Sequence, residues 1–177
     1  MHRNHAVTRR TFLRSAATAG LGLAVVPGAA TTRVAAQPGG AVRVQLIRHA
    51  TCLIRYAGRT LLLDPMLGDQ GVRPPIANTP NPRPNPLVAL PSPAARLLDG
   101  VDAVLVTHTH SDHWDPEATT LVPKGTTLVI QPPDAAKFAD WGFAAAQPVA
   151  ESTTWQGITI TRTGGQHDRG AVAARLA

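Results

Sequence analysis

Cysteine, aromatic residues and charge are all scarce in this 177-residue chain. A single cysteine excludes an internal disulfide framework and any cysteine-rich zinc module. Only three Phe, three Trp and one Tyr are present to stack bases, and no basic stripe carries interleaved aromatics, so nucleic acid is not expected as a partner. The low charge, 16% against 44% hydrophobic residues, excludes a disordered composition and favours one globular domain.

Acidic residues are absent from the first 36 positions, which hold five arginines. Without this segment 12 basic and 11 acidic residues remain, a net charge of +1, so five of the six net positive charges belong to the N-terminus. Thr8–Arg14 (TRRTFLR) contains a twin-arginine pair, residues 16–26 are apolar, and small residues at 34–36 offer a cleavage site. This order predicts that residues 1–36 are a twin-arginine (Tat) export signal, and therefore that the protein is periplasmic or secreted.

The apolar run of this segment is short and rich in Ala, Gly and Thr, which is weak for crossing about 30 Å of hydrocarbon. We therefore expect removal of the signal and no stable membrane span afterwards. Retention of the segment as an N-terminal membrane anchor stays open as the alternative.

Residues 37–177 alternate β-rich runs with short helical patterns, which predicts a mixed α/β domain with one core. Strands are expected at 41–48, 51–57, 60–64, 102–107, 126–131 and 157–163, and helices at 115–122 and 134–141, with a helical turn near 93–98. Nine prolines make 65–93 a poor candidate for regular structure. This Pro-rich loop is interpreted either as a functional lid or as a solvated insert.

The chemistry is concentrated in one turn, where His108-Thr-His110-Ser-Asp112-His113 directly follows an apolar strand. His108 and His110 are two residues apart, so on extended backbone their imidazoles point the same way. Asp112 and His113 lie where the chain turns toward the next helix, so their side chains can bind a second metal ion near the first. Imidazole with carboxylate suits zinc, with manganese or iron as alternatives. The pattern predicts a two-metal site.

This HxHxDH signature resembles that of the metallo-β-lactamase superfamily. Two further stretches, Ile47–Ile54 (IRHATCLI) and Leu62–Leu67 (LLDPML), resemble the branch that contains ascorbate-6-phosphate lactonase and N-acylphosphatidylethanolamine phospholipase D. The resemblance implies an αββα sandwich. It also implies a zinc-dependent hydrolase that uses a metal-bound hydroxide on an ester, lactone or phosphodiester of a small-molecule substrate.

The resemblance also assigns roles to residues. His108, His110 and the later His167 would bind the first metal, and Asp112 and His113 the second, with Asp112 also orienting the hydroxide. Three other residues, His49, Asp64 and Trp114, could either line the pocket or have a structural role. The structural roles would be a hydrogen-bonded histidine at a strand start for His49, an acceptor of backbone amides near the site for Asp64, and a packing residue for Trp114.

The family's second half usually supplies a bridging Asp and a final His for the second metal, and only ten residues follow His167. We therefore expect the N-terminal half of the sandwich plus part of the second half, with the second metal site incomplete. One interpretation is a C-terminally truncated copy, whose alternative function is that of a catalytically inactive metal-binding remnant. The other is a natural short form that associates with another chain through an exposed sheet.

Overall fold

The computed structural model describes residues 41–75 and 80–164. The predicted export signal and His167 lie outside these residues. None of the helices in the two described ranges is long and apolar enough to cross a membrane.

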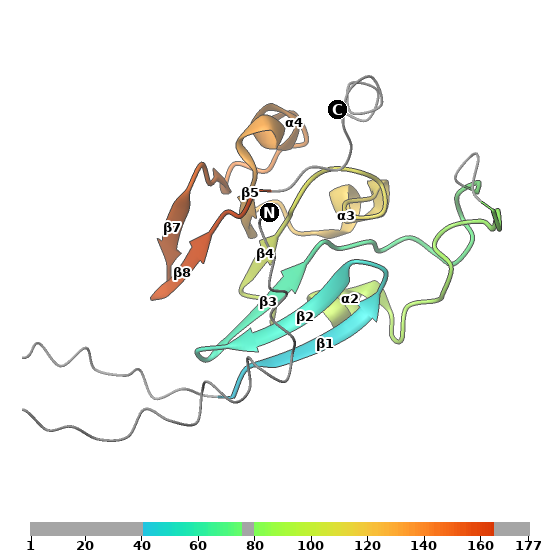
Figure 1. Ribbon diagram of the computed structural model, residues 1–177, viewed down its shortest axis with the longest axis horizontal. Coiled ribbons are helices and arrows are strands. Elements are labelled where there is room, and N and C mark those ends of the chain that lie inside the picture. The colour runs from blue at the N-terminus through green and yellow to red at the C-terminus, as the bar shows by residue number, and fades with distance from the viewer. Residues whose placement is uncertain (1–40, 76–79, 165–177) are drawn as a thin grey trace, which may run out of the picture. The chain divides into compact units, whose positions relative to one another are not determined.

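A six-stranded sheet forms the centre of the domain, in the order β1-β2-β3-β4-β5-β6 (Figure 1). The first three strands are antiparallel, and the last three continue parallel to β3. Their bounds are β1 (Arg43–Arg48), β2 (Thr51–Tyr56), β3 (Arg59–Leu63), β4 (Ala103–Leu105), β5 (Thr127–Ile130) and β6 (Ala146–Pro148). Because β3, β4 and β5 are parallel, their carboxyl ends meet at one edge, where loops can gather functional side chains.

The helices cover one face of this sheet. They are α2 (Ala94–Leu98), α3 (Pro116–Leu121) and α4 (Ala135–Asp140), with a short 3₁₀ turn, η1 (Pro132–Asp134), before α4. Leu62, Val104 and Leu128 point to the helices from the central strands and are fully buried. Phe138 and Phe143 complete this main core from the helical side. The alternation along β3, β4 and β5 therefore assigns one face of each strand to the helices.

A two-stranded hairpin, β7 (Ser152–Trp155) and β8 (Ile158–Thr161), packs on the opposite face. A smaller core joins Ile158 of β8 to Leu61 and Ala103 of the sheet. The hairpin leaves part of this face uncovered, because Val44 and Leu46 of the edge strand β1 are 63% and 67% exposed.

The predicted mixed α/β fold is confirmed, and the six expected strands and three helices all form. Both tight hairpins follow from local sequence: Ala57-Gly58 and Gln156-Gly157 have positive φ throughout, as two-residue turns between antiparallel strands require. Two strands were missed. β6 is the sequence Ala-Gln-Pro, which carries no strand signal, and β7 is too polar to show clear alternation.

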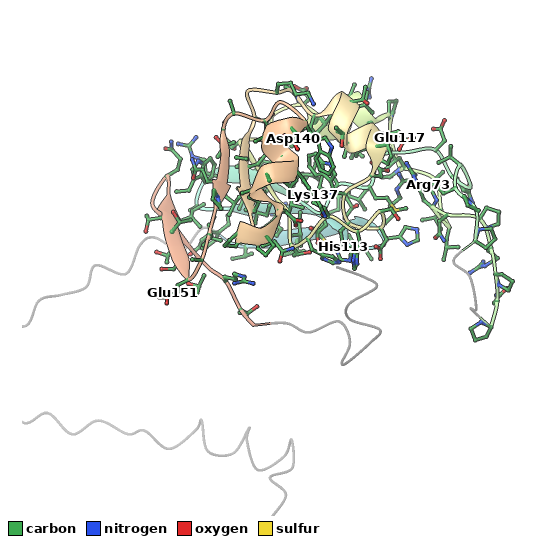
Figure 2. The ribbon with its side chains drawn as sticks, turned by 90° about the horizontal axis from the view of Figure 1, so that it is seen from above. Arg73, His113, Glu117, Lys137, Asp140 and Glu151 are labelled. Atoms are coloured by element: carbon green, nitrogen blue, oxygen red, sulfur yellow. The ribbon has the colours of Figure 1, made fainter. Side chains whose placement is uncertain are left out.

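The described parts of the Pro-rich loop have no helix or strand, as expected, yet they are held in place. The amide of Gly71 donates to the Pro86 carbonyl at 2.9 Å, and Arg73 pairs with Asn85 through backbone hydrogen bonds. The Arg73 side chain also contacts Glu117 of α3 (Figure 2). These contacts fasten parts of the loop to the domain, although most of its described residues are exposed. Whether the loop is a lid or a solvated insert stays a prediction.

Candidate metal centre

The histidine-rich turn begins three residues after the end of β4, at the edge where the parallel strands end. The amides of His113 and Trp114 both donate to the His110 carbonyl at 2.8 Å, which closes the chain into a tight turn. The turn brings three imidazoles together. The ring centroids of His108 and His110 lie 4.6 Å apart, and those of His108 and His113 lie 3.9 Å apart.

Thr109, between the first two histidines, anchors this part of the turn through its side chain. Its hydroxyl donates to Asp134 at 2.8 Å, and the Gln131 side-chain amide donates to the other oxygen of the same carboxylate. Asp134 is 4% exposed and sits in η1, immediately before α4. The turn is therefore tied to the neighbouring strand end as well as to its own backbone.

Asp64 organises the other side of the turn. It directly follows β3 and is 2% exposed, and its carboxylate accepts three hydrogen bonds at 2.7–2.8 Å. The donors are the amide and hydroxyl of Thr107 and Nδ1 of His113. Asp64 has a positive φ of 44°, a conformation that Asp tolerates better than most residues and that recurs at functional sites.

The contact with Asp64 sets the proton position on His113. A carboxylate can only accept, so His113 donates from Nδ1 and, when neutral, keeps its lone pair on Nε2. The hydrogen bond to Asp64 raises the pKa of His113 above its ordinary value, and partial burial opposes this rise. His113 Nε2 faces the Asp112 carboxylate, 3.6 Å away, and the Asp112 side chain is 51% exposed.

The nitrogen and oxygen atoms of the turn form two donor pairs with spacings that suit metal ions. His108 Nε2 and His110 Nδ1 lie 3.1 Å apart. Two nitrogens bound to one tetrahedral zinc at 2.0–2.1 Å would lie about 3.3 Å apart. Within residues 41–75 and 80–164, no three His, Cys, Asp or Glu side chains converge on a single point. The donor set therefore fits a metal in chemistry and in pair spacing, and each pair needs a further ligand.

His49 lies in the turn between β1 and β2 and binds the Pro-rich loop. The amide of Leu87 donates to His49 Nε2 at 2.9 Å, so the neutral ring carries its proton on Nδ1. Burial lowers the pKa of His49, and the adjacent Arg48 guanidinium lowers it further. Arg48 is itself buried and donates to the carbonyls of Met66, Gly68 and Val88. Both residues thus fasten the loop beside the site.

Trp114 does not face the site. It is 3% exposed and packs in the main core against Phe138 and Phe143, with ring centroids 4.9 and 5.5 Å away. Of the two roles left open for Trp114, its position fits packing, because the indole is buried in the main core. Its Nε1 donates to Thr119 Oγ1, which satisfies the indole within the core.

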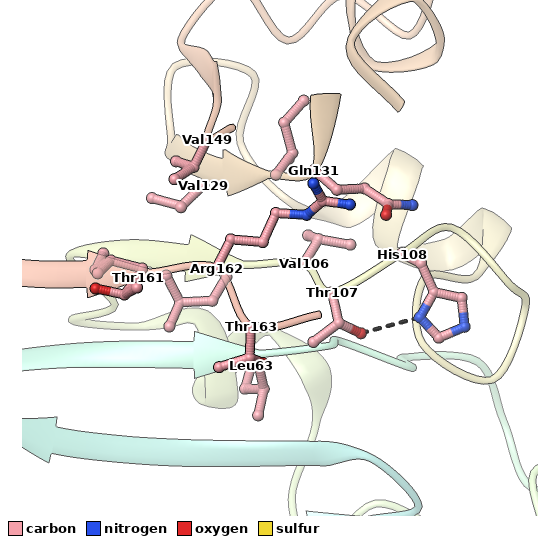
Figure 3. A pocket seen from close by; sticks show the side chains of 13 residues that line it. Leu63, Val106, Thr107, His108, Val129, Gln131, Val149, Thr161, Arg162 and Thr163 are labelled. Atoms are coloured by element: carbon pink, nitrogen blue, oxygen red, sulfur yellow. Dashed lines mark hydrogen bonds between the residues drawn. The ribbon is translucent and has the colours of Figure 1, made fainter. Parts of the chain in front are cut away.

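Sequence reasoning missed Thr107 as part of the site. Its hydroxyl lies 3.0 Å from His108 Nδ1 (Figure 3). It also lies 3.2 Å from His113 Nδ1 and donates to Asp64. It therefore links both donor pairs to one carboxylate. The only sequence signal was its place before the first histidine, since Asp64 is 43 positions away.

Comparison with known proteins identifies the family of this chain. Residues 43–175 match the family described as the beta-lactamase superfamily domain, and the chain belongs to that family. It is 37% identical over 131 residues to the UPF0173 protein YddR of Bacillus subtilis (strain 168), covering 73% of this chain and 52% of the relative. The chain thus spans about half the length of this curated relative.

Two solved structures are also similar. One is isothiocyanate hydrolase from Delia radicum gut bacteria, with 39% identity and a TM-score of 0.67 over 74% of this chain and 51% of that one. The other is a possible metal-dependent hydrolase from Veillonella parvula DSM 2008, with 35% identity and a TM-score of 0.71 over 75% and 53%. Both support the metallo-β-lactamase fold for this chain.

Proposed function

We propose that this chain is a metal-dependent hydrolase acting on a small molecule, with zinc as the metal. The observation that carries the proposal is the close spacing of His108 Nε2 and His110 Nδ1, at 3.1 Å, beside the second donor pair, Asp112 with His113. Family membership and the similar hydrolase structures support it.

Each donor pair would hold one metal ion. His108 and His110 would hold the first, and we propose His167, outside the described residues, as a further ligand. Asp112 and His113 would hold the second. A metal bound here supplies Lewis acidity and lowers the pKa of water toward neutrality. Among the chain's own groups, the exposed Asp112 carboxylate orients the attacking water, and Asp64 holds His113 with its Nε2 lone pair outward.

The substrate class is proposed from chemistry. Esters, lactones and phosphodiesters each present an electrophilic centre that water attacks with a metal's help. A similar solved structure is an isothiocyanate hydrolase, which adds the isothiocyanate carbon as a fourth electrophile to test. Manganese and iron are the competing metals for the same donors.

Metal content of the purified full chain tests the proposal, measured by plasma mass spectrometry after equilibration with zinc and gel filtration. We expect one to two zinc ions per chain, and hydrolysis of at least one of the four substrate classes. The double variant His108→Ala/His110→Ala should lose at least one ion per chain and lower the hydrolysis rate at least about 100-fold, since the first ion would lose two ligands.

His49→Gln provides the matched control. His49 Nε2 already accepts the Leu87 amide, so we expect this variant to keep its metal. A wild-type chain that folds but binds no metal would overturn the proposal. So would hydrolysis that is unchanged in the double variant. Metal binding without turnover would favour the alternative of an inactive metal-binding remnant.

We also propose that residues 1–36 direct export by the twin-arginine pathway, which rests on the sequence pattern alone.

A further inference from the structure

We propose that a pocket beside the metal centre binds the apolar body of an organic carboxylate, and that Arg162 holds its carboxylate group. Arg162 would thereby select anionic substrates. This inference rests on the proposed hydrolase function and adds the substrate's charge to it.

The pocket lies between the central sheet and the hairpin and has a volume of about 570 Å³. Small-molecule sites commonly occupy 300–1,000 Å³. Its walls are apolar and come from the ends of four strands: Leu63, Leu105, Val129 and Ile160. His108, a member of the first donor pair, also lines it (Figure 3). A molecule bound here therefore has one end beside the candidate metal centre.

Arg162 supplies the only full charge among the described residues that line this pocket. Thr107, His108 and Gln131 provide neutral or titratable polar groups, and no Asp or Glu is among the lining residues. Arg162 is solvent-exposed, so an anionic group can approach its guanidinium while a hydrocarbon body contacts the apolar walls. A ligand that matches both features has a hydrocarbon body and one negative charge.

The backbone of Arg162 is fixed, and its guanidinium is available. Its amide donates to the Glu151 carbonyl at 2.7 Å, just after β8 ends. Figure 3 shows the side chain extending across the pocket toward Gln131. Within the described ranges its guanidinium makes no hydrogen bond or ion pair, whereas Arg59 pairs with Asp102.

Guanidinium geometry favours a carboxylate as the ligand group. Its planar fork can donate two parallel hydrogen bonds to two carboxylate oxygens, and such charge-assisted pairs are stronger than neutral ones. A neutral molecule in the same place would leave the guanidinium without this partner. The expected discrimination is therefore about tenfold in favour of the anion.

Calorimetric titration of the full chain with octanoate and octanamide tests this. The two probes share one hydrocarbon body and differ in charge. Each is titrated into zinc-loaded chain and into chain stripped of metal with a chelator. We expect octanoate to bind about tenfold more tightly than octanamide in both states. Arg162→Gln should abolish the preference, and Arg162→Lys should keep part of it.

Arg55→Gln is the matched control, because Arg55 is exposed on the other face of the sheet and its loss changes the net charge equally. It should leave both affinities unchanged. A preference for octanoate that survives in Arg162→Gln would overturn the inference. So would a preference seen only with zinc, which would mean that the metal takes the carboxylate. Failure of octanoate to bind would also overturn it.

Metal content and turnover of a neutral ester separate this inference from the proposed function. Arg162→Gln should bind as much zinc as the wild type, and its hydrolysis rate should fall more for an ester that carries a carboxylate than for the neutral ester. Arg162-dependent octanoate binding in a chain that binds no metal would support the anion site and reject the hydrolase.

Discussion

Asp64 shows how much a single residue can organise. Sequence reasoning placed it near the site as an acceptor of backbone amides, and it does accept the amide of Thr107. Its contact with His113, 49 positions later, required β3 and β4 to pair in parallel. Local sequence cannot specify such a contact, because it depends on which strands become neighbours.

Replacing Asp64 by Asn tests this role. The amide keeps the shape of the carboxylate but removes the charge that holds His113 and the Thr107 hydroxyl. We expect zinc affinity to fall about 10- to 100-fold, as for other partners that orient metal-binding histidines. Competition with a chromophoric chelator measures the change. Asp102→Asn is the control: it alters the acceptor of the Thr60 amide, away from the site, and should leave zinc affinity unchanged.

The same variant has a pH signature in the metal-free chain. Because folding raises the pKa of His113, its stabilising contribution is complete below the unfolded pKa of about 6.5 and is lost as pH rises through the folded pKa. Asp64→Asn should lower the pKa of His113 and remove this dependence. Titration of the His113 ring protons by NMR measures it directly. Equal pKa values in the two proteins would contradict the assignment.

At the scale of elements, α3 begins as its sequence predicts. Asp115 precedes Pro116, and its carboxylate accepts the Ala118 amide at 2.7 Å. The structure shows a second role for Asp115, because its other carboxylate oxygen accepts a hydrogen bond from the Gly68 amide at 2.8 Å. Asp115 is fully buried and also lies 3.6 Å from Arg73. The helix cap therefore also fastens the Pro-rich loop.

Asp115→Ala should cost about 2–4 kcal/mol of unfolding free energy. This cost is the sum of two contributions: the loss of the helix N-cap, and the buried Gly68 amide left without a hydrogen-bond acceptor. Urea denaturation followed by circular dichroism gives the value. The exposed Asp99→Ala, at the end of α2, should change stability by no more than about 0.5 kcal/mol. A similar small loss for Asp115→Ala would show that the loop relaxes without it.

At the scale of the whole molecule, the two faces of the sheet are covered unequally. Helices bury one face, whereas a single hairpin covers part of the other and leaves Val44 and Leu46 exposed on an edge strand. Association with another chain through this exposed sheet stays a prediction. Light scattering tests it, and a strict monomer at all concentrations would exclude it.

The proposed export belongs to the whole chain as well. Changing both Arg9 and Arg10 to Lys keeps the charge of the segment and removes the twin-arginine pair. We expect the protein to stay in the cytoplasm of a host that has the Tat pathway, as cell fractionation would show. Changing the neighbouring Arg3 to Lys should leave export intact. Export of the double variant at the normal level would contradict a Tat signal.

The sequence by itself determined six of the eight described strands, the three helices, the tight turn at Ala57-Gly58 and the cluster of metal-binding side chains in one turn. All of these depend on neighbours within a few positions, through alternation, turn chemistry and capping. Only the tertiary structure decided that Asp64 holds His113, that His49 fastens the Pro-rich loop and that Arg162 reaches the pocket beside His108. Each of these joins distant segments, and their meeting is fixed by strand pairing and core packing.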